Sequence, residues 1–314
     1  MRISDYEGAD YERNFWQAPG RQYDDQIERV AMRRLLPVGG RLLELASGYG
    51  RLTNLYSGFQ QVVLVDLNLA HLEAARERYG DDGYLYVAAD IYNLPFAPGQ
   101  FDVVTMVRAL HHMDDPQRAL RGIRAVLRRG GSLVLEYNNK RNLKTVAKWL
   151  LKKMLVPGKG WAASAHNPFT REPVQYYSLY YGLHPEHVKD MLVHAGLVPQ
   201  RRLAVAYLRV SLLTRLLPPG LMAKLDSAMQ LTGDWFLFSP TGFVRARAVG
   251  GDEEGSPSAF WRCPACHGFD LRTSDQGLAC QGCGRDWPIK NGVIDFRIPV
   301  EEELLVSVAA TTGW

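Results

Sequence analysis

The residues best suited to hold a metal are the four cysteines of this 314-residue chain. They form two pairs, each with two residues between its members, and 13 residues separate the pairs. Four thiolates in two such knuckles suit tetrahedral zinc, and because four sulfurs leave no open coordination position, we expect the zinc to be structural. Two disulfides are the alternative, which suits an oxidising compartment. The predicted ligands are Cys263, Cys266, Cys280 and Cys283.

A glycine-rich turn follows the apolar segment 41–46 and forms a second candidate site. Gly48 and Gly50 match the first two glycines of a dinucleotide-binding fingerprint, but Thr53 stands in the third position. A β-branched side chain there hinders close packing of helix on strand, which disfavours NAD. Glu44 favours a different ligand, because its carboxylate can meet the cationic α-amino group of S-adenosylmethionine, which has no pyrophosphate to bind.

Two more acids end predicted strands in the same way. Asp66 ends the strand 61–66, at about the spacing where an acid meets ribose hydroxyls, and Asp90 ends the strand 84–90. Asp90 and the following Ile91 can hold an adenine by its amino group and its face. Since ligands bind at the carboxyl edge of open α/β sheets, we expect Glu44, Asp66 and Asp90 to line one cleft. The alternative is that each acid only caps the helix or turn that follows it.

Candidates for proton transfer follow the fourth and fifth predicted strands. His111 and His112 come after the strand 101–107, and Tyr137 ends the strand 132–137. A general base helps methyl transfer only if the acceptor must lose a proton. The alternatives are a histidine that packs beneath its loop and a polar turn that leads into the next segment. Three neighbours of Tyr137 can also contact an acceptor: Glu136, Asn138 and Asn139.

Alternating strands and helices must position these residues. Short apolar segments predict buried strands over 41–46, 61–66, 84–90, 101–107 and 132–137. Helical spacing and capping residues predict helices over 23–36, 69–79 and 116–129 and within 184–196. The segments 198–209 and 236–248 suit antiparallel strands that close the sheet. The pattern predicts an α/β, doubly wound, mostly parallel sheet with right-handed crossovers.

Residues 138–183 interrupt this rhythm and predict an inserted helical cap. Within the cap, 141–155 have the pattern of an amphipathic helix, with Lys144, Lys148 and Lys152 in a row beside an apolar face. Such a helix can bind a membrane surface or an RNA backbone. The simpler expectation is a helix docked by its apolar face, with the lysines in water. Four tyrosines suit either helix packing or an acceptor pocket: Tyr176, Tyr177, Tyr180 and Tyr181.

Composition and domain organisation limit the function classes. The net charge of +4 does not demand a nucleic-acid partner. No apolar stretch reaches the ~20 residues that cross a bilayer, and the N-terminal segment lacks the apolar core of a secretory signal. Together with cysteines spaced for a metal, this predicts a cytoplasmic protein. We expect a main domain over 1–249, a linker over 250–259, a cysteine module over 260–299 and a tail over 300–314.

The segments ELASGYG, LVDLN, AADIYNLPF and FDVVTMVRALHHMDDP resemble successive motifs of the class I (Rossmann-like) S-adenosylmethionine-dependent methyltransferases. The resemblance covers about residues 22–137 and extends more loosely to 248. It implies a seven-stranded-type sheet with the cofactor across the strand ends. Ala46 departs from the family, which usually has glycine there. The cofactor-binding residues that the resemblance implies are Tyr11, Glu44, Ala46, Ser47, Gly48, Asp66, Leu67, Asp90, Ile91, Val107, Arg108 and His112.

An aromatic segment precedes the first predicted helix. In similar enzymes such a segment folds over the cofactor as a lid, and an ordinary packed N-terminal arm is the alternative. Its members are Tyr6, Tyr11, Phe15 and Trp16.

The cysteine module has a resemblance of its own. CPAC, CQGC and WPIKNGVIDF, over about 260–298, resemble the small zinc-ribbon activator proteins of tRNA, rRNA and release-factor methyltransferases. Likeness of fold does not transfer a substrate, so three roles remain open for the module: a grip on RNA, recruitment of a partner, and stabilisation of the catalytic domain.

These observations together predict methyl transfer from S-adenosylmethionine to a small or amphiphilic organic acceptor. One alternative is an RNA methyltransferase that grips tRNA or rRNA with the zinc ribbon and the basic helix. The other is a non-catalytic cofactor-binding scaffold or activator. Peripheral contact with a membrane is compatible with methyl transfer to an amphiphilic acceptor. The sequence does not indicate an oligomeric state.

Overall fold

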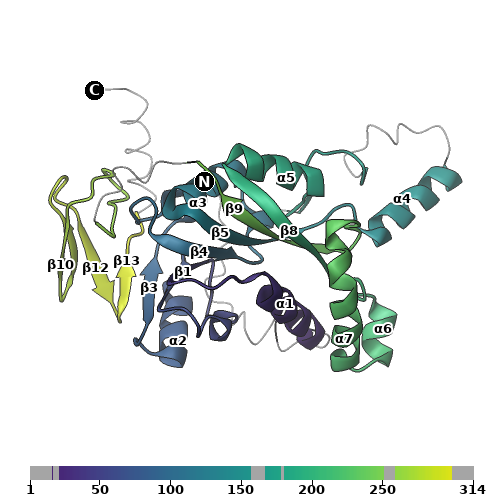
Figure 1. Ribbon diagram of the computed structural model, residues 1–314, viewed down its shortest axis with the longest axis horizontal. Helices are drawn as coiled ribbons and strands as arrows, with labels where there is room; N and C mark the ends of the chain where they lie inside the picture. The colour runs from purple at the N-terminus through teal and green to yellow at the C-terminus, as the bar shows by residue number, and fades with distance from the viewer. Residues whose placement is uncertain (1–15, 17–20, 157–166, 178–179, 251–258, 299–314) are drawn as a thin grey trace.

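A computed structural model of the chain describes residues 16, 21–156, 167–177, 180–250 and 259–298. Its centre is a twisted sheet with helices on both faces (Figure 1). Seven strands form the main part of this sheet: β1 (Arg41–Leu45), β2 (Gln61–Asp66), β3 (Tyr84–Ala88), β4 (Phe101–Met106), β5 (Leu127–Asn138), β8 (Leu197–Val205) and β9 (Thr241–Ala248). The helices that pack on it are α1 (Arg21–Leu35), α2 (Leu69–Tyr79), α3 (Pro116–Val126), α5 (Pro185–His194), α6 (Ser211–Leu216) and α7 (Pro219–Met229).

The strand order β3-β2-β1-β4-β5-β9-β8 confirms the predicted mostly parallel sheet. The strands from β3 to β5 run parallel, and β9 lies antiparallel between β5 and β8. The order of the strands reverses between β1 and β4, and this switch point is where open α/β sheets bind ligands.

Two apolar layers hold the helices against the sheet. Buried residues of α3 and α5 join one hydrophobic cluster, and those of α1, α2 and α7 join the other. Odd-numbered residues of β5 such as Leu133 and Leu135 belong to the first cluster, and Val134 belongs to the second, as the alternation of side chains along a strand requires. The sheet is therefore doubly wound, as predicted.

The boundary between α3 and β5 differs from the sequence-based expectation. We expected a helix over 116–129, but α3 ends at Val126 and β5 begins at Leu127. Leu127 has an extended backbone and pairs with Phe101 of β4, so pairing with the sheet ends the helix earlier than its own pattern indicates.

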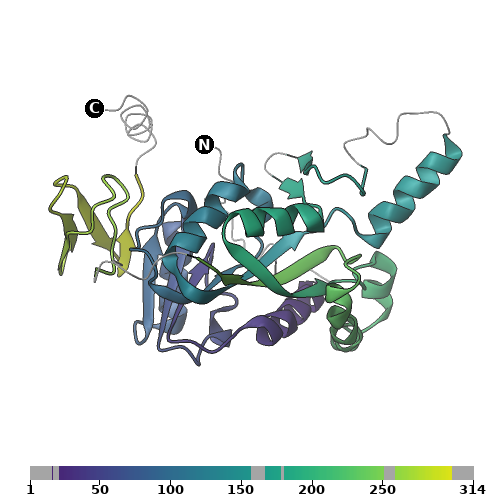
Figure 2. The same ribbon diagram turned by 45° about the horizontal axis from the view of Figure 1, so that its top comes forward.

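The inserted segment is only partly helical. It contains α4 (Leu143–Leu155) and an antiparallel pair, β6 (Val174–Tyr177) with β7 (Tyr180–Gly182). Three of the four tyrosines lie in paired positions of this hairpin, so the expected helix packing is wrong for Tyr177, Tyr180 and Tyr181. The described residues do not bury the apolar face of α4 as expected: Trp149 packs on Phe169 with 5.5 Å between ring centroids, but no residue of the helix is fully buried. Figure 2 shows α4 projecting from one end of the molecule.

The cysteine module continues the central sheet. Its strands are β10 (Leu271–Ser274), β11 (Gly277–Cys280), β12 (Asp286–Lys290) and β13 (Val293–Asp295), and the complete order is β10-β11-β12-β13-β3-β2-β1-β4-β5-β9-β8. β13 pairs in parallel with β3, and the N–H of Phe296 donates to the carbonyl oxygen of Ala88 at 2.8 Å. The module therefore covers the carboxyl end of the β3 edge, at Val87 and Ala88. Most of the linker and all of the tail that we predicted lie outside the described residues.

Aromatic packing reinforces this junction. The ring of Trp261 stacks on that of Phe96 with 5.6 Å between centroids, and Phe260 lies 5.5 Å from Phe96. The N–H of Ala97 donates to the carbonyl oxygen of Phe260 at 2.9 Å. The main domain and the cysteine module thus share one hydrophobic core, which includes Cys263, Trp287 and Phe296.

Candidate cofactor site and cysteine cluster

The turn after β1 brings main-chain N–H groups to the carboxyl edge of the sheet. Ala46, Gly48 and Gly50 all have positive φ values, of 52°, 54° and 75°. A Cβ on Gly50 would meet the Tyr79 ring at 2.8 Å, so the helix side of the turn is full. A Cβ on Gly48 would meet no protein atom within 4 Å, so this side of the turn has room for a ligand. Ser47 lies between Ala46 and Gly48 and is mostly buried.

Glu44 is buried at the end of β1 with its carboxylate held by two hydroxyls. The Thr53 hydroxyl donates to Oε2 at 2.6 Å, and the Tyr56 hydroxyl donates to Oε1 at 3.1 Å. Burial raises the pKa of Glu44 to about 7, although both hydrogen bonds favour the carboxylate. Thr53 therefore takes the place of the third fingerprint glycine and serves as a partner for Glu44.

Asp66 ends β2, and Asp90 follows the end of β3 at the same edge, two residues beyond Ala88, where the strand ends earlier than the expected 84–90. Asp66 accepts the N–H of Gly48 at 2.8 Å and that of Asn68 at 2.9 Å. Asp90 accepts the N–H of Tyr92 at 2.9 Å at the start of the short helix η3 (Ile91–Asn93). Both acids therefore cap turns, as the simpler alternative requires. Glu44 and Asp66 are close enough that the charge of Asp66 helps to raise the pKa of Glu44.

The cysteine module contributes a further acid beside these three. Asp295 ends β13 opposite Ala88, at the same edge of the sheet as Asp90. It pairs with Arg297 at 2.8 Å and with Lys290 at 2.9 Å, and despite burial these cations lower its pKa to about 2. Nη1 of Arg297 approaches the carbonyl oxygen of Leu67 at 3.4 Å, so the module reaches the loop after β2.

A buried ion-pair network ties α1 to both sides of the site. The carboxylate of Glu28 binds Arg51 from the glycine-rich turn at 2.6 Å and also Arg108 from the loop after β4. Burial alone would raise the pKa of Glu28, but Arg108 and Arg51 outweigh it and hold the pKa at about 2. Arg108 has a φ of 59°, and its N–H donates to Glu136 at 2.8 Å. The Arg108 side chain thus points to Glu28, while Val107 beside it is half-buried.

Trp16 lies over this network. The guanidinium of Arg51 is 3.8 Å from its ring centroid, and that of Arg108 is 4.7 Å away. The other aromatic residues expected in an N-terminal lid, Tyr6, Tyr11 and Phe15, lie outside the described residues.

The two candidate histidines meet a buried acid and a tyrosine of the insert. Nδ1 of His111 lies 3.8 Å from Oε2 of Glu136, and the ring of Tyr180 lies 5.0 Å from His111 and 5.4 Å from His112. Burial raises the pKa of Glu136 to about 7, and burial lowers the pKa of His111 well below its usual value. A neutral imidazole and a protonatable carboxyl therefore lie together next to the loop after β4.

Tyr137 does not join this group. It belongs to the hydrophobic cluster on the α3 and α5 face of the sheet, is 1% exposed, and packs so closely on Gly242 that a Cβ there would lie 2.5 Å from its ring. Glu136, its neighbour on β5, faces the opposite side of the sheet, where Arg108 and His111 lie. The structure therefore favours Glu136 over Tyr137 as the candidate for proton transfer.

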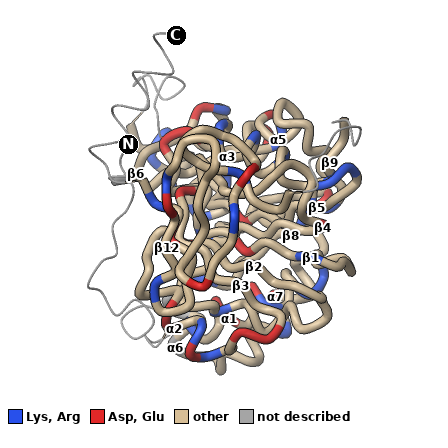
Figure 3. Tube along the Cα trace, turned by 90° about the vertical axis from the view of Figure 1, so that its left-hand side faces the viewer, with Lys and Arg blue, Asp and Glu red and all other residues tan. Residues whose placement is uncertain are grey.

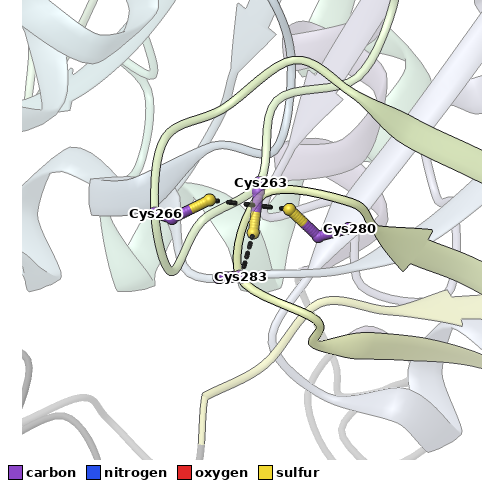
Figure 4. A group of neighbouring side chains, drawn as sticks. All are labelled: Cys263, Cys266, Cys280 and Cys283. Atoms are coloured by element: carbon purple, nitrogen blue, oxygen red, sulfur yellow. Dashed lines mark hydrogen bonds between the residues drawn. The ribbon is translucent and has the colours of Figure 1, made fainter.

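The four cysteines form one cluster, with no disulfide between them (Figure 4). Their sulfurs lie within 4.8 Å of one another, with Sγ–Sγ distances of 3.8 Å for Cys263–Cys283 and 3.5 Å for Cys266–Cys280. Zinc–sulfur bonds of about 2.3 Å in a tetrahedron require sulfurs about 3.8 Å apart. The residues present therefore fit a four-sulfur zinc ion.

The surface of the cysteine module carries both signs of charge. Figure 3 shows Lys and Arg interspersed with Asp and Glu on this side of the molecule. Residues 260–298 contain five basic residues and four acidic ones, and an excess of one positive charge does not point to an RNA backbone. The basic residues are Arg262, Arg272, Arg285, Lys290 and Arg297, and the acidic residues are Asp270, Asp275, Asp286 and Asp295.

Sequence reasoning missed the ion-pair network and the role of β13. One signal was available for the network: Glu28 falls on the apolar stripe of α1 with Ile27, Ala31 and Met32, and an acid there requires a buried cation. No such signal marks β13, because pairing between strands so distant in sequence depends on the assembled edge of the sheet.

Comparison with known proteins agrees with this geometry. Residues 43–135, from β1 into β5, match the family model of a methyltransferase domain. The chain therefore contains a methyltransferase domain on a Rossmann-like α/β fold.

Two bacterial relatives are both named ubiquinone/menaquinone biosynthesis C-methyltransferase UbiE. The protein from Idiomarina loihiensis is 38% identical over 109 residues, which make up 32% of this chain and 43% of the relative. The protein from Pseudomonas savastanoi pv. phaseolicola is 34% identical over 170 residues, 50% of this chain and 65% of the relative. The matched part of the chain thus covers less than two thirds of either relative.

A solved structure shows the same fold. The crystal structure of an S-adenosylmethionine dependent methyltransferase from Mesorhizobium loti aligns with a TM-score of 0.51 and 21% identity, over 72% of this chain and 99% of that one. At this level of identity the likeness establishes the fold.

Proposed function

We propose that this protein transfers the methyl group of S-adenosylmethionine to a small or amphiphilic organic acceptor. The observation that carries the proposal is that Glu44, Asp66 and Asp90 lie at or just beyond the carboxyl ends of three neighbouring parallel strands, beside a turn with open space at Gly48. Glu44 would hold the α-ammonium group, Asp66 with Leu67 the ribose, and Asp90 with Ile91 the adenine. The match to a methyltransferase domain supports this assignment.

The remaining cofactor contacts follow from the same placement. Gly48 and Ser47 would lie along the methionine end, with Ala46 in the turn, and Val107 and His112 beside the methyl group. Arg108 would act indirectly, because its side chain is already held by Glu28. Tyr11 stays a prediction of the sequence alone.

S-adenosylmethionine supplies an activated methyl group, which is displaced in line by the acceptor while the sulfonium becomes a neutral thioether. The protein's task is then to place the acceptor ~3 Å from the methyl carbon and to exclude water. Where the acceptor must lose a proton, Glu136 would receive it, because its pKa lies near 7, while the lowered pKa of His111 would keep that imidazole neutral beside it.

The cysteine cluster would hold a structural zinc ion through Cys263, Cys266, Cys280 and Cys283. We propose that this zinc ribbon, which resembles the activator proteins of other methyltransferases, stabilises the methyltransferase domain by covering the edge of β3. Its balanced charge and its place in the sheet favour this role over a grip on RNA. Free cysteines arranged for a metal also support a cytoplasmic location.

The proposal is tested by incubating the protein with methyl-labelled S-adenosylmethionine and fractionated cell extract. We expect label in the lipid or small-metabolite fraction, and loss of this label with Asp66→Ala. Label in RNA instead would show a tRNA or rRNA methyltransferase. Cofactor binding without labelling of any fraction would show a scaffold. A protein that takes up no cofactor in calorimetry would refute all three.

A further inference from the structure

The helix α4 is too exposed to be explained by packing against the described residues of this chain. None of its residues is buried, and Met154 and Leu155 are 78% and 72% exposed. Leu143, Leu150 and Leu151 expose 64%, 46% and 56%. A helix of 13 residues is only marginally stable in water by itself, and its stability normally comes from burying an apolar face. The apolar face of α4 therefore calls for a partner outside the described chain.

The positive charge on α4 indicates that its partner is negatively charged. Lys144, Lys148, Lys152 and Lys153 are all exposed, and no acid occurs between Lys140 and Val156. The lysine row runs beside the apolar face, so one surface can approach both. An RNA backbone would satisfy the lysines and leave the leucines in water, whereas an anionic lipid surface takes up both kinds of side chain.

A second set of exposed apolar side chains lies at the same end of the molecule. Figures 1 and 2 both place α4 with α6 and α7 at the end opposite the zinc ribbon. The segment after α7 exposes Trp235 by 81% and Phe236 by 61%. The same segment contacts the N-terminus of α4, because the N–H of Leu143 donates to the carbonyl oxygen of Phe238 at 2.8 Å. The helices α6 and α7 add exposed leucines at Leu216, Leu221 and Leu225.

From these observations we propose that this end of the molecule docks on an anionic phospholipid bilayer. We call it the lipid-facing end and define it by α4, α6, α7 and the Trp235–Phe236 pair. The apolar face of α4 lies among the acyl chains near the headgroups, with its lysines against the lipid phosphates. Among the described residues no helix is long and apolar enough to cross a bilayer, so the contact is peripheral.

Docking at this end would bring the bilayer to the acceptor side of the methyltransferase domain. The chain passes from the end of β5 to the first turn of α4 within a few residues, and Glu136 lies near that end of β5. Delivery of an amphiphilic acceptor from the bilayer rests on the proposed function. The docking itself does not, since it is measured without cofactor or acceptor.

The test is co-flotation of the full chain with vesicles, at low and at physiological salt. One set of vesicles is pure phosphatidylcholine and the other contains phosphatidylglycerol. We expect the chain to float with the anionic vesicles and to be released as salt rises. Lys144→Ala with Lys148→Ala and Lys152→Ala should lower partitioning by roughly 100-fold, because each lysine near an anionic surface contributes about a factor of five. Met154→Ser with Leu155→Ser should lower it about tenfold.

Matched variants at the other surfaces serve as controls. Arg121→Ala with Arg129→Ala and Arg272→Ala removes three exposed bases away from the lipid-facing end, and Val38→Ser changes an apolar residue that is 98% exposed. Both should partition as the unchanged chain does. Equal loss in the control and α4 variants would overturn the proposal, as would no flotation with anionic vesicles. Lysine-dependent binding of structured RNA without flotation would reassign α4 to RNA.

Discussion

Ala46 stands in the left-handed region at a position where glycine would be relaxed. Its φ is 52°, and a residue with a Cβ costs about 1 kcal/mol or more there. Ala46→Gly should therefore raise the free energy of unfolding by about 0.5–1 kcal/mol, after the greater freedom of glycine in the unfolded chain is counted. In thermal unfolding this corresponds to an increase in Tm of about 1–2 °C.

An alanine-to-glycine substitution on α2 provides the control, with the opposite effect on stability. Ala74 is an exposed helical residue, so Ala74→Gly should destabilise the protein by about 1 kcal/mol. A destabilised Ala46→Gly variant would mean that the Ala46 methyl group makes contacts that outweigh its backbone strain.

The pKa of Glu44, about 7, makes cofactor affinity depend on pH. An ammonium group binds the carboxylate and not the acid, so affinity should rise as pH rises toward 7 and level off above it. S-adenosylhomocysteine carries the same ammonium group and serves as the ligand. Calorimetry at pH 6 in two buffers of different ionisation enthalpy should show release of up to about one proton per bound ligand.

Two variants separate Glu44 from Glu136, whose pKa burial also raises to about 7. Glu44→Gln should bind more weakly and with little dependence on pH in this range. Glu136→Gln should keep the dependence, because Glu136 lies on the acceptor side with Arg108 and His111. Binding by the unchanged protein without proton release would place the ammonium group elsewhere.

The sequence predicted some residues of the site better than others, for a physical reason. Glu44, Asp66 and Asp90 could be assigned to one edge because parallel strands end on the same side of their sheet. Tyr137 could not be separated from Glu136 by pattern alone, because both faces of a central strand are buried and the face of each side chain depends on the register. Arg108 has a partner in Glu28, 80 residues away, which no local pattern reveals.

At the scale of elements, α1 is attached to the site by one buried acid. Glu28 is fully buried and balances both Arg51 and Arg108. Glu28→Gln should lower the free energy of unfolding by about 3–5 kcal/mol, because it removes the buried carboxylate that neutralises Arg108 and leaves Asp25 as the carboxylate paired with Arg51. Urea unfolding measures this loss. It should also remove a stabilisation that the unchanged protein has above pH ~4.5 and loses toward pH 2, since the pKa of Glu28 is lowered to about 2.

An exposed ion pair provides the comparison. Arg171 and Asp190 lie 2.9 Å apart with side chains that are 64% and 44% exposed. Asp190→Asn should cost less than about 1 kcal/mol, because water and salt screen such a pair. Similar losses for Glu28→Gln and Asp190→Asn would show that the Glu28 network does not hold α1.

The inserted segment shows that the residue pattern of a helix or strand does not determine what packs against it. The hydrophobic periodicity of residues 141–155 correctly predicts a helix with an apolar face. It does not identify the surface that covers this face. The tyrosines after it have spacings that suit a helix, yet residues 174–177 and 180–182 pair as antiparallel strands, and Tyr180 reaches His111 and His112. Pairing with a nearby strand outweighs intrinsic preference in so short a segment.

At the scale of the whole molecule, the cysteine module, our proposed zinc ribbon, forms one sheet with the methyltransferase domain. A parallel sheet that ended at β3 would expose a row of unpaired main-chain groups, and β13 covers them. The ribbon itself is too small to build much core, so a bound zinc ion would contribute much of its folding free energy. Metal binding and the order of the β3 edge should therefore be coupled.

Removal of the metal tests this coupling on the full chain. A strong chelator should lower the Tm of the methyltransferase domain and weaken binding of S-adenosylhomocysteine, because β13 pairs with β3 just before Asp90 and Arg297 reaches the Leu67 carbonyl. Cys283→Ser should have the same two effects, and the chelator should change this variant no further. If the chelator releases zinc while Tm and affinity both stay constant, the ribbon folds apart from the site. If Tm falls and affinity does not, β13 stabilises the sheet without shaping its ligand-binding edge.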